Sequence, residues 1–303
     1  MAEAAATDST EIFARGTLQT GTAGGGELRW AFVDLTEIVE TMRGRMDLSP
    51  VAAAALGRSL AGATLMLRMA AKTPSRMVLE VHGDGPLGHL MVEVDDAGNL
   101  RGRVAHRQVD VPHTAAGKLN VGAAVGKGLL RVGRERQGKR YQSQVELVSG
   151  EIGDDLAHYL LQSEQTRTAV LVGVLGKPQG VAGAGGLIVE VLPDGGLEAV
   201  ERLESNIAAT VGVSRLIEAG GREETLGAIL AGLDPVVHED LPVQYRCRCS
   251  RSRLRNHLAV LSREEIESIV GESGEIEADC VFCCAQYRFQ PQDLIAAGSS
   301  SKA

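Results

Sequence analysis

The placement of the five cysteines constrains this chain of 303 residues more than any other feature. All five lie after residue 246, as a Cys-x-Cys pair, Cys247 and Cys249, and a later Cys-x-x-Cys pair, Cys280 and Cys283, which Cys284 directly follows. Cytosolic thiols stay reduced, so cysteines crowded into one segment there indicate metal binding or redox chemistry rather than a static disulfide framework. We expect the C-terminal segment to fold around these thiols.

The two pairs have the spacing of a zinc site. Structural zinc takes four thiolates in a tetrahedron, with sulfurs about 2.3 Å from the metal. A tight turn brings both sulfurs of Cys-x-x-Cys to one metal, and an extended Cys-x-Cys backbone points both side chains to one side. We therefore predict one zinc ion held by Cys247, Cys249, Cys280 and Cys283. Cys284 is a spare thiol, an alternative ligand or, in the interpretation we favour, a small buried side chain.

The segment of about 30 residues between the pairs contains a helix start. Ser262 is followed three positions later by Glu265, the pattern of a capping box. The helix is predicted to run to about Val270 and to end at Gly271. So small a unit is not expected to be stable without the metal.

Basic residues crowd the first cysteine pair: Arg246, Arg248, Arg251, Arg253 and Arg255. They either lower the pKa of the thiolates and offset their charge, or form a solvated basic loop. A nucleic-acid interface is disfavoured because acidic residues equal basic ones after residue 240, and the whole chain has a formal net charge of −8. Phe282, Tyr287 and Phe289 suit a core as well as a stacking platform.

The glycine-rich stretches and the histidines do not match the patterns of known nucleotide-binding or catalytic sites. The glycines of residues 122–128 miss the phosphate-loop spacing and lack a Ser or Thr after the lysine, and those of residues 180–186 do not fit the dinucleotide fingerprint. Both stretches are predicted to be turns. The seven histidines show no pairing at ligand spacing, and no Ser-His-Asp arrangement can be inferred. We therefore expect no enzyme.

The pattern along the chain predicts an α+β fold with three parts. Residues 11–195 form a domain of antiparallel strands and helices, residues 196–232 a helical connector, and residues 233–293 the small zinc-binding domain. Residues 1–10 and 294–303 are expected to be disordered tails.

Local signals support the larger domain. The glycines at 24–26 predict a hairpin turn, and strands at 77–82, 88–94 and 100–105 predict an antiparallel meander. Ser49 and Pro50 start a core helix that runs to about Lys72. Its arginines, Arg58 and Arg68, argue against a membrane span, and the first residues lack the pattern of a signal peptide, so a cytoplasmic location is expected. Helices are predicted at 198–219 and 223–230, separated by Gly220 and Gly221.

These residues together resemble a known family. Besides the cysteine tail, the stretch LVSGEI at 147–152, DLAHY at 155–159 and SEQ at 163–165 are similar to the central signature of the bacterial 33-kilodalton heat-shock proteins, which are redox-regulated holdase chaperones. The glycine-rich start of a strand at 184–186 and its end at 192–193 fit as well. The resemblance covers about residues 13–291. Cys284 and the alanine-rich first residues depart from the family pattern.

The resemblance implies a mechanism. The reduced chain holds one zinc ion, and oxidants convert the thiolates into disulfides between Cys247 and Cys249 and between Cys280 and Cys283, with release of the zinc. The zinc domain then unfolds, the connector helices loosen, and the exposed apolar surface binds unfolding client proteins without ATP. The active form is expected to be a homodimer that binds neither nucleic acid nor membrane.

Two other function classes compete with this one. A zinc-dependent nucleic-acid-binding protein would use the arginines at 246–255 and would show salt-dependent binding. A thiol–disulfide oxidoreductase would use Cys280 and Cys283, but it requires a thioredoxin-like βαβ context, and here an acidic turn precedes the pair.

Overall fold

The computed structural model describes residues 11–70, 74–193, 195–271 and 273–300. Contacts divide the chain into two compact units, one from Phe13 to Tyr245 and a smaller one that contains the residues from Arg246 onwards. The predicted tail at residues 1–10 lies outside the described residues, as do residues 301–303.

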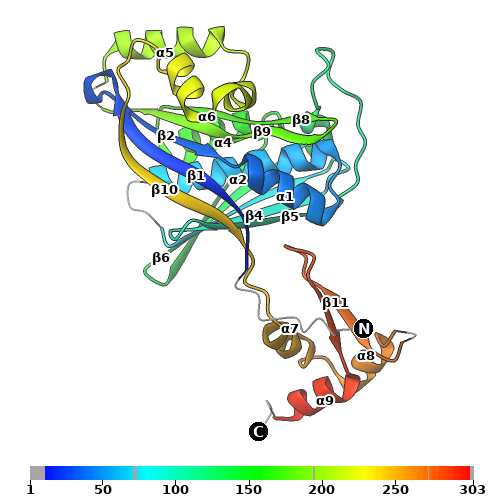
Figure 1. Ribbon diagram of the computed structural model, residues 1–303. Helices are drawn as coiled ribbons and strands as arrows, with labels where there is room; N and C mark the ends of the chain where they lie inside the picture. Colours follow the sequence, from blue (N-terminus) through cyan, green and yellow to red (C-terminus); the bar gives the residue numbers. More distant parts are fainter. Residues whose placement is uncertain (1–10, 71–73, 194, 272, 301–303) are drawn as a thin grey trace. The chain divides into compact units, whose positions relative to one another are not determined.

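The larger unit is built on a ten-stranded sheet with the order β7-β6-β3-β4-β5-β10-β1-β2-β9-β8 (Figure 1). Neighbouring strands β3, β4 and β5 pair antiparallel, which confirms the predicted meander, and β1 and β2 form a hairpin across the 3-10 turn η1 (Gly24–Gly26). The strands are β1 (Ile12–Ala23), β2 (Leu28–Asp34), β3 (Arg76–Gly83), β4 (His89–Asp95), β5 (Asn99–Val104), β6 (Gly128–Arg136), β7 (Lys139–Glu146), β8 (Thr168–Lys177), β9 (Gly180–Val191) and β10 (Val236–Arg246).

The helix α2 (Pro50–Met69) forms the centre of the core, and the sheet curls around it so that strands of both halves contact it (Figure 1). Ser49 caps it as predicted, because its side chain accepts a hydrogen bond from the Ala52 N–H at 3.4 Å. The helix ends at Met69, before the predicted Lys72. Arg58 and Arg68 pair with the carboxylates of Glu151 and Glu239.

Among the described residues, α2 is the one helix long and apolar enough to cross a membrane, but 89% of its most apolar window is buried inside the protein. That burial is typical of a core helix.

The remaining helical segments described in the larger unit are all shorter than α2, and α5 and α6 are the longest of them. They are α1 (Thr36–Met46), α3 (Val121–Val125), α4 (Gly153–Tyr159), the π-helical turn η2 (Leu160–Glu164), α5 (Leu197–Ala209) and α6 (Val213–Ile229).

The signature stretch before α4 is held by one buried carboxylate. Asp155 is fully buried and accepts hydrogen bonds from the backbone N–H groups of Val148, Ser149, Gly150 and Ile152, at 2.7 to 3.3 Å. A carboxylate that satisfies several buried donors fixes the loop around it. This contact gives the motif at residues 147–155 a structural role.

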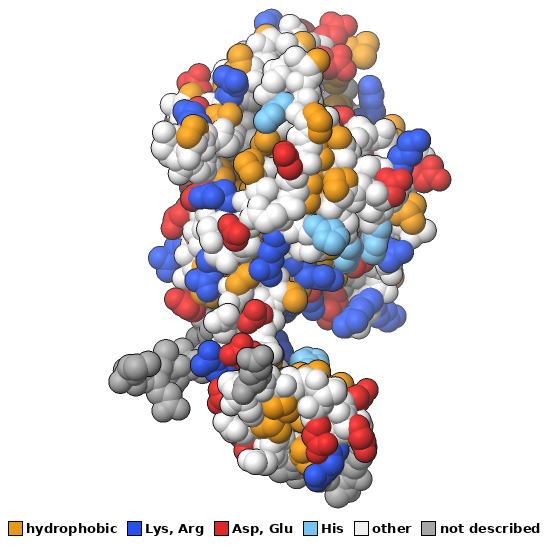
Figure 2. Space-filling model, turned by 90° about the vertical axis from the view of Figure 1, so that its right-hand side faces the viewer, with side chains coloured by type: hydrophobic (Ala, Val, Ile, Leu, Met, Phe, Trp, Pro, Cys, Tyr) orange, Lys and Arg blue, Asp and Glu red, His pale blue; other side chains and the backbone are white. Residues whose placement is uncertain are grey.

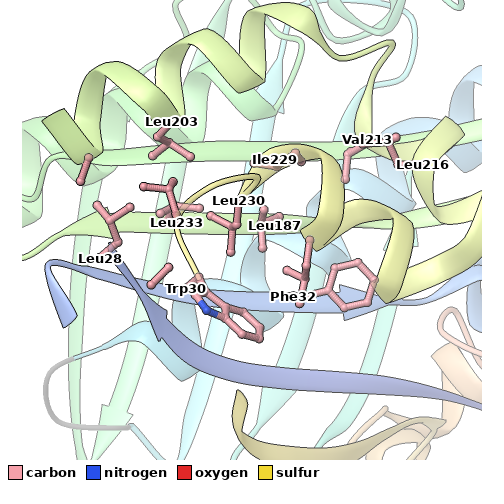
Figure 3. Close-up of a cluster of buried hydrophobic side chains, with 14 of the residues drawn as sticks. Leu28, Trp30, Phe32, Leu187, Leu203, Val213, Leu216, Ile229, Leu230 and Leu233 are labelled. Atoms are coloured by element: carbon pink, nitrogen blue, oxygen red, sulfur yellow. The ribbon is translucent and has the colours of Figure 1, made fainter. Parts of the chain in front are cut away.

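The predicted connector, residues 196–232, belongs to the larger unit and covers one face of β2 and β9 (Figure 3). The predicted helix at 198–219 is wrong as a single helix, because the chain breaks between α5 and α6, where Gly212 has a φ of 106°. The interruption at Gly220 and Gly221 is confirmed, since both leave the helical conformation inside α6.

The glycines at 180–186 form part of strand β9, so the predicted turn there is wrong. A Cβ atom at Gly183 would lie 2.3 Å from the carbonyl oxygen of Ser214 in α6, and one at Gly185 would lie 2.1 Å from that of Val33. These glycines therefore permit the close approach of α6 and β2 to β9. The other tract, at 122–128, lies on the short helix α3 and its end.

The structure places the boundary between the units after Tyr245 rather than at residue 233. The reason is β10, which inserts between β5 and β1 and pairs parallel with β5, Gln244 opposite Asn99 and Tyr245 opposite Leu100. Side chains of β1 hydrogen-bond it as well, including Gln19, whose Nε2 donates to Asp240 Oδ2 at 2.6 Å.

The smaller unit contains α7 (Arg251–Leu258), α8 (Arg263–Ser268), the antiparallel strands β11 (Ile276–Asp279) and β12 (Gln286–Phe289), and α9 (Pro291–Ser300). The capping box is confirmed, although α8 ends before the predicted Val270. The tail predicted from residue 294 is wrong up to Ser300. Pro291 is well suited to begin α9, and Leu294 is fully buried.

Candidate metal centre

The two cysteine pairs sit on two different local structures. Cys247 and Cys249 lie in the extended segment between β10 and α7, whose N-cap Ser250 accepts a hydrogen bond from the Arg253 N–H at 3.1 Å. Alternation along an extended backbone turns both thiols inward, and the side chain of Arg248 between them is exposed.

Cys280 and Cys283 lie in the tight turn that joins β11 to β12. The Cys280 N–H donates to the Ala285 carbonyl at 2.9 Å, and the Cys284 N–H donates to the Cys280 carbonyl at 2.8 Å. Cys284 has a φ of 58°, the left-handed conformation that closes the turn. The turn thereby presents both thiols of the Cys-x-x-Cys pair in one direction.

The structure brings the four predicted thiols together. Cys247 Sγ lies 3.6 Å from Cys280 Sγ, Cys249 Sγ lies 3.4 Å from Cys283 Sγ, and all four sulfurs lie within 4.8 Å of one another. A tetrahedral ion with metal–sulfur bonds of about 2.3 Å requires sulfurs about 3.8 Å apart. The donor set and its spacing therefore fit one metal ion of the zinc type.

All four thiols are buried and free of disulfide bonds. Hydrogen bonds from Cys247 and then from Cys280 and Cys283 hold the pKa of Cys249 far below its usual range. Hydrogen bonds with Cys247, Cys249 and Cys280 raise the pKa of Cys283 far above that range. A dication bound by the four sulfurs would offset the negative charge that four thiolates place in one buried site.

Sequence reasoning missed the contribution of Tyr287. Its hydroxyl donates a hydrogen bond to Cys249 Sγ at 3.1 Å, and its ring is 2% exposed. Phe289 is buried too, with the guanidinium carbon of Arg251 4.7 Å from its ring centre. The sequence left open whether the aromatic residues of this segment form a core or a platform for stacking bases. Tyr287 and Phe289 are buried, so they belong to the core of the smaller unit. A signal for this existed, because the two residues alternate along a strand.

The arginines near the first pair face solvent. Arg248, Arg251, Arg253 and Arg255 are exposed, and Arg253 Nη1 donates to the carbonyl of Arg248 at 2.8 Å. Acidic and basic side chains lie side by side on the face of the molecule in Figure 2. The basic side chains are therefore exposed to solvent, but the predicted loop is wrong for Arg251, Arg253 and Arg255, which lie on helix α7.

Cys284 lies outside the group of four thiols that could hold one ion, and its side chain is half-buried. The favoured interpretation of Cys284 as a small buried side chain is therefore wrong. The residue occupies the left-handed position of the turn, which holds its neighbour Cys283 in place.

The expectation that no histidines pair is also wrong. His82 on β3 lies directly opposite His89 on β4, and both lie near Glu80. The spacing of seven residues hid this pair, because only the register of the hairpin, closed by the loop at 84–88, places the two histidines opposite each other.

Comparison with known proteins gives a consistent result. Residues 16–290 match the family model described as Hsp33 protein. The chain is 44% identical over 291 residues to a 33 kDa chaperonin of Thermus thermophilus, covering 92% of this chain and 85% of that protein. It is 43% identical over 276 residues to the 33 kDa chaperonin of Symbiobacterium thermophilum, covering 89% and 93%.

A solved structure is similar as well. The crystal structure of the 33 kDa chaperonin, a heat shock protein 33 homolog, from Thermotoga maritima aligns with a TM-score of 0.86 and 33% sequence identity. The alignment covers 95% of this chain and 99% of that one.

Proposed function

The chain belongs to the Hsp33 family, and from this premise we propose that it is a redox-regulated chaperone that holds unfolding proteins without ATP. One observation carries the proposal: four buried, mutually adjacent thiols form the centre of the smaller unit. A thiolate cluster is both a metal site and the group of a protein most readily attacked by peroxide. The cytoplasm, where thiols stay reduced, is the proposed compartment.

The four cysteines are the proposed sensor. A bound zinc ion supplies a cross-link between residues about 30 positions apart. Oxidation to disulfides between Cys247 and Cys249 and between Cys280 and Cys283 converts each pair of thiolates into neutral sulfurs that no longer bind the ion. A Cys-x-Cys disulfide closes a small ring, so thiol systems can readily reduce it and reset the site.

The smaller unit has few other means of staying folded. Its buried side chains besides the four thiols are Ile266, Ile276, Tyr287, Phe289 and Leu294 among the described residues. Zinc binding contributes on the order of 10 kcal/mol to the folding of units of this size. Loss of the thiolate ligands therefore unfolds the unit.

The proposed client surface lies beneath α5 and α6. Trp30, Phe32 and Leu187 of β2 and β9 form one buried cluster with residues of these helices, among them Leu203 and Leu216 (Figure 3). Only Ala199 and Leu203 of α5 are buried, so that helix is held by a small apolar contact. Loosening of α5 and α6 uncovers a contiguous apolar face of the sheet, which is the kind of surface that binds exposed apolar segments of other proteins.

The test compares the reduced and oxidised chain. We expect about one zinc per chain before peroxide treatment and little after it, with suppression of client aggregation only afterwards. The matched control is Cys284→Ser, which leaves the four thiols intact and is expected to switch like the parent. Cys283→Ser is expected to bind zinc weakly and to be active without peroxide. Equal chaperone activity in the reduced and oxidised parent would refute the proposal.

Two finer points have their own tests. Peptide mapping of the oxidised chain tests the disulfide pairs, and cross-pairs such as Cys249 with Cys283 would contradict them. Light scattering before and after oxidation tests the homodimer that the family resemblance implies for the active form.

A further inference from the structure

Three potential ligands meet on the outer face of the sheet, in the larger unit and apart from the cysteines. Glu80 and His82 lie two residues apart on β3, so their side chains leave the same face, and His89 lies opposite His82 on β4. The buried residues of β3 are the alternate ones, Met77, Leu79 and Val81. We propose that Glu80, His82 and His89 form a second metal site, which binds a divalent transition-metal ion such as zinc or nickel.

The distances suit a single ion. His89 Nε2 lies 3.4 Å from Glu80 Oε1, His82 Nε2 lies 3.8 Å from Glu80 Oε2, and the three ligand atoms all lie within 4.8 Å of one another. Ligands bound at about 2.0–2.1 Å in a tetrahedron lie about 3.4 Å apart. The imidazole rings are stacked, with centres 4.3 Å apart and planes 23° apart, and both Nε2 atoms lie within 4 Å of the Glu80 carboxylate. Side-chain shifts of about an ångström complete the site.

The ring nitrogens that face Glu80 are unsatisfied. Both Nε2 atoms, of His82 and of His89, are buried from solvent and have no hydrogen-bond partner. Their polar neighbour is the Glu80 carboxylate, at 3.4 Å from His89 Nε2 and 3.8 Å from His82 Nε2, which is long for a hydrogen bond. An ion between the three groups would satisfy both nitrogens and the carboxylate. An ion held by two imidazoles and one carboxylate has further coordination positions that water can fill. Imidazole nitrogens bind zinc, nickel and copper in preference to magnesium and calcium.

The surroundings set the strength of the site. Two guanidiniums oppose a dication: Arg131 Nη1 lies 4.0 Å from Glu80 Oε2, and Arg103 Nη2 lies 3.4 Å from His89 Nδ1. Coordination through Nε2 places the imidazole proton on Nδ1, so Arg103 has to give up this contact. The site is therefore weaker than the tetrathiolate, and Arg103→Gln strengthens it.

Calorimetric titration tests the site in the reduced full-length chain, loaded beforehand with one equivalent of zinc to fill the cysteine site. Zinc chloride is expected to bind as a second equivalent. His89→Ala and Glu80→Gln are expected to weaken this second binding at least tenfold, and Arg103→Gln to tighten it. The matched control, His113→Ala, removes an exposed histidine outside the cluster and is expected to change nothing. Absence of a second equivalent, or unchanged second binding in His89→Ala, would overturn the proposal.

A second measurement needs no variant. Nickel added in substoichiometric amounts to the zinc-loaded chain is expected to broaden the imidazole resonances of His82 and His89 before those of the other histidines, because paramagnetic broadening falls steeply with distance. Uniform broadening of the seven histidines would contradict the site.

Discussion

Tyr287→Phe tests the metal centre with the smallest possible change. The tyrosine hydroxyl donates to Cys249 Sγ at 3.1 Å, while the ring packs in the core of the smaller unit. Phenylalanine keeps the ring and removes the donor. The substitution therefore isolates the contribution of one hydrogen bond to a thiolate ligand.

The magnitude follows from the charge of the acceptor. A hydrogen bond to a charged group contributes about 1.5–3 kcal/mol. A metal ion shares the charge of the sulfur, so the lower end applies, and about 1.4 kcal/mol corresponds to a tenfold change in binding. We expect zinc affinity to fall about tenfold. The same loss leaves more electron density on Cys249, so peroxide should oxidise the site faster.

Competition with a chromophoric zinc chelator measures the affinity, and the rate of zinc release at fixed peroxide concentration measures the oxidation. The control is Tyr141→Phe, which removes the hydroxyl of a tyrosine that is 57% exposed in the larger unit. The reasoning fails if Tyr287→Phe binds zinc as tightly as Tyr141→Phe and releases it at the same rate, because the hydroxyl would then contribute nothing to the ligand.

Three further predictions concern the rest of the chain. Chelation of zinc under reducing conditions should abolish amide-exchange protection from Arg246 onwards while the strands of the larger unit keep theirs, as exchange mass spectrometry would show. Asn206→Ala removes two 3.0 Å hydrogen bonds from α5 to the carbonyls of Ile229 and Ala231, so it should lower the peroxide concentration that half-activates the chaperone; an unchanged concentration would contradict this. Burial raises the pKa of Glu93, but the charges of Arg101 and Arg76 outweigh it and hold that pKa below its ordinary value. The ion pairs of Glu93 thus stabilise the fold above about pH 4.5 and are lost on acidification, so Glu93→Gln should cost about 1–3 kcal/mol at pH 7 and less at pH 3 in urea unfolding.

The clustering of the four thiols could be predicted because the sequence patterns behind it are local. Two short cysteine spacings and a capping box at Ser262 are patterns that geometry translates directly into a turn, an extended segment and a helix. The hydroxyl of Tyr287 could not be placed in this way, because its contact with Cys249 depends on how the hairpin of β11 and β12 packs against the first cysteine pair.

In the larger unit, too, some elements could be predicted from local sequence patterns and others depend on contacts distant in sequence. The N-cap of α2 and the β3–β5 meander follow from local patterns. The helix α1 also has a local signal, because its buried residues Ile38, Val39, Met42 and Met46 have helical periodicity. The strand β10 has no such pattern, since it contains charged residues and Pro242. Its place is set by β5 and β1, which lie more than a hundred residues away in sequence.

The position of β10 has a consequence for synthesis of the chain. Strands β5 and β1 are both complete before residue 105, yet the strand that joins them is not made until residue 246. A nascent chain therefore carries two open strand edges from the completion of β5 at Val104 until β10 is made, and such edges invite pairing with other chains. The sheet can close only after residue 246 has been synthesised, and the first cysteine pair, Cys247 and Cys249, follows directly.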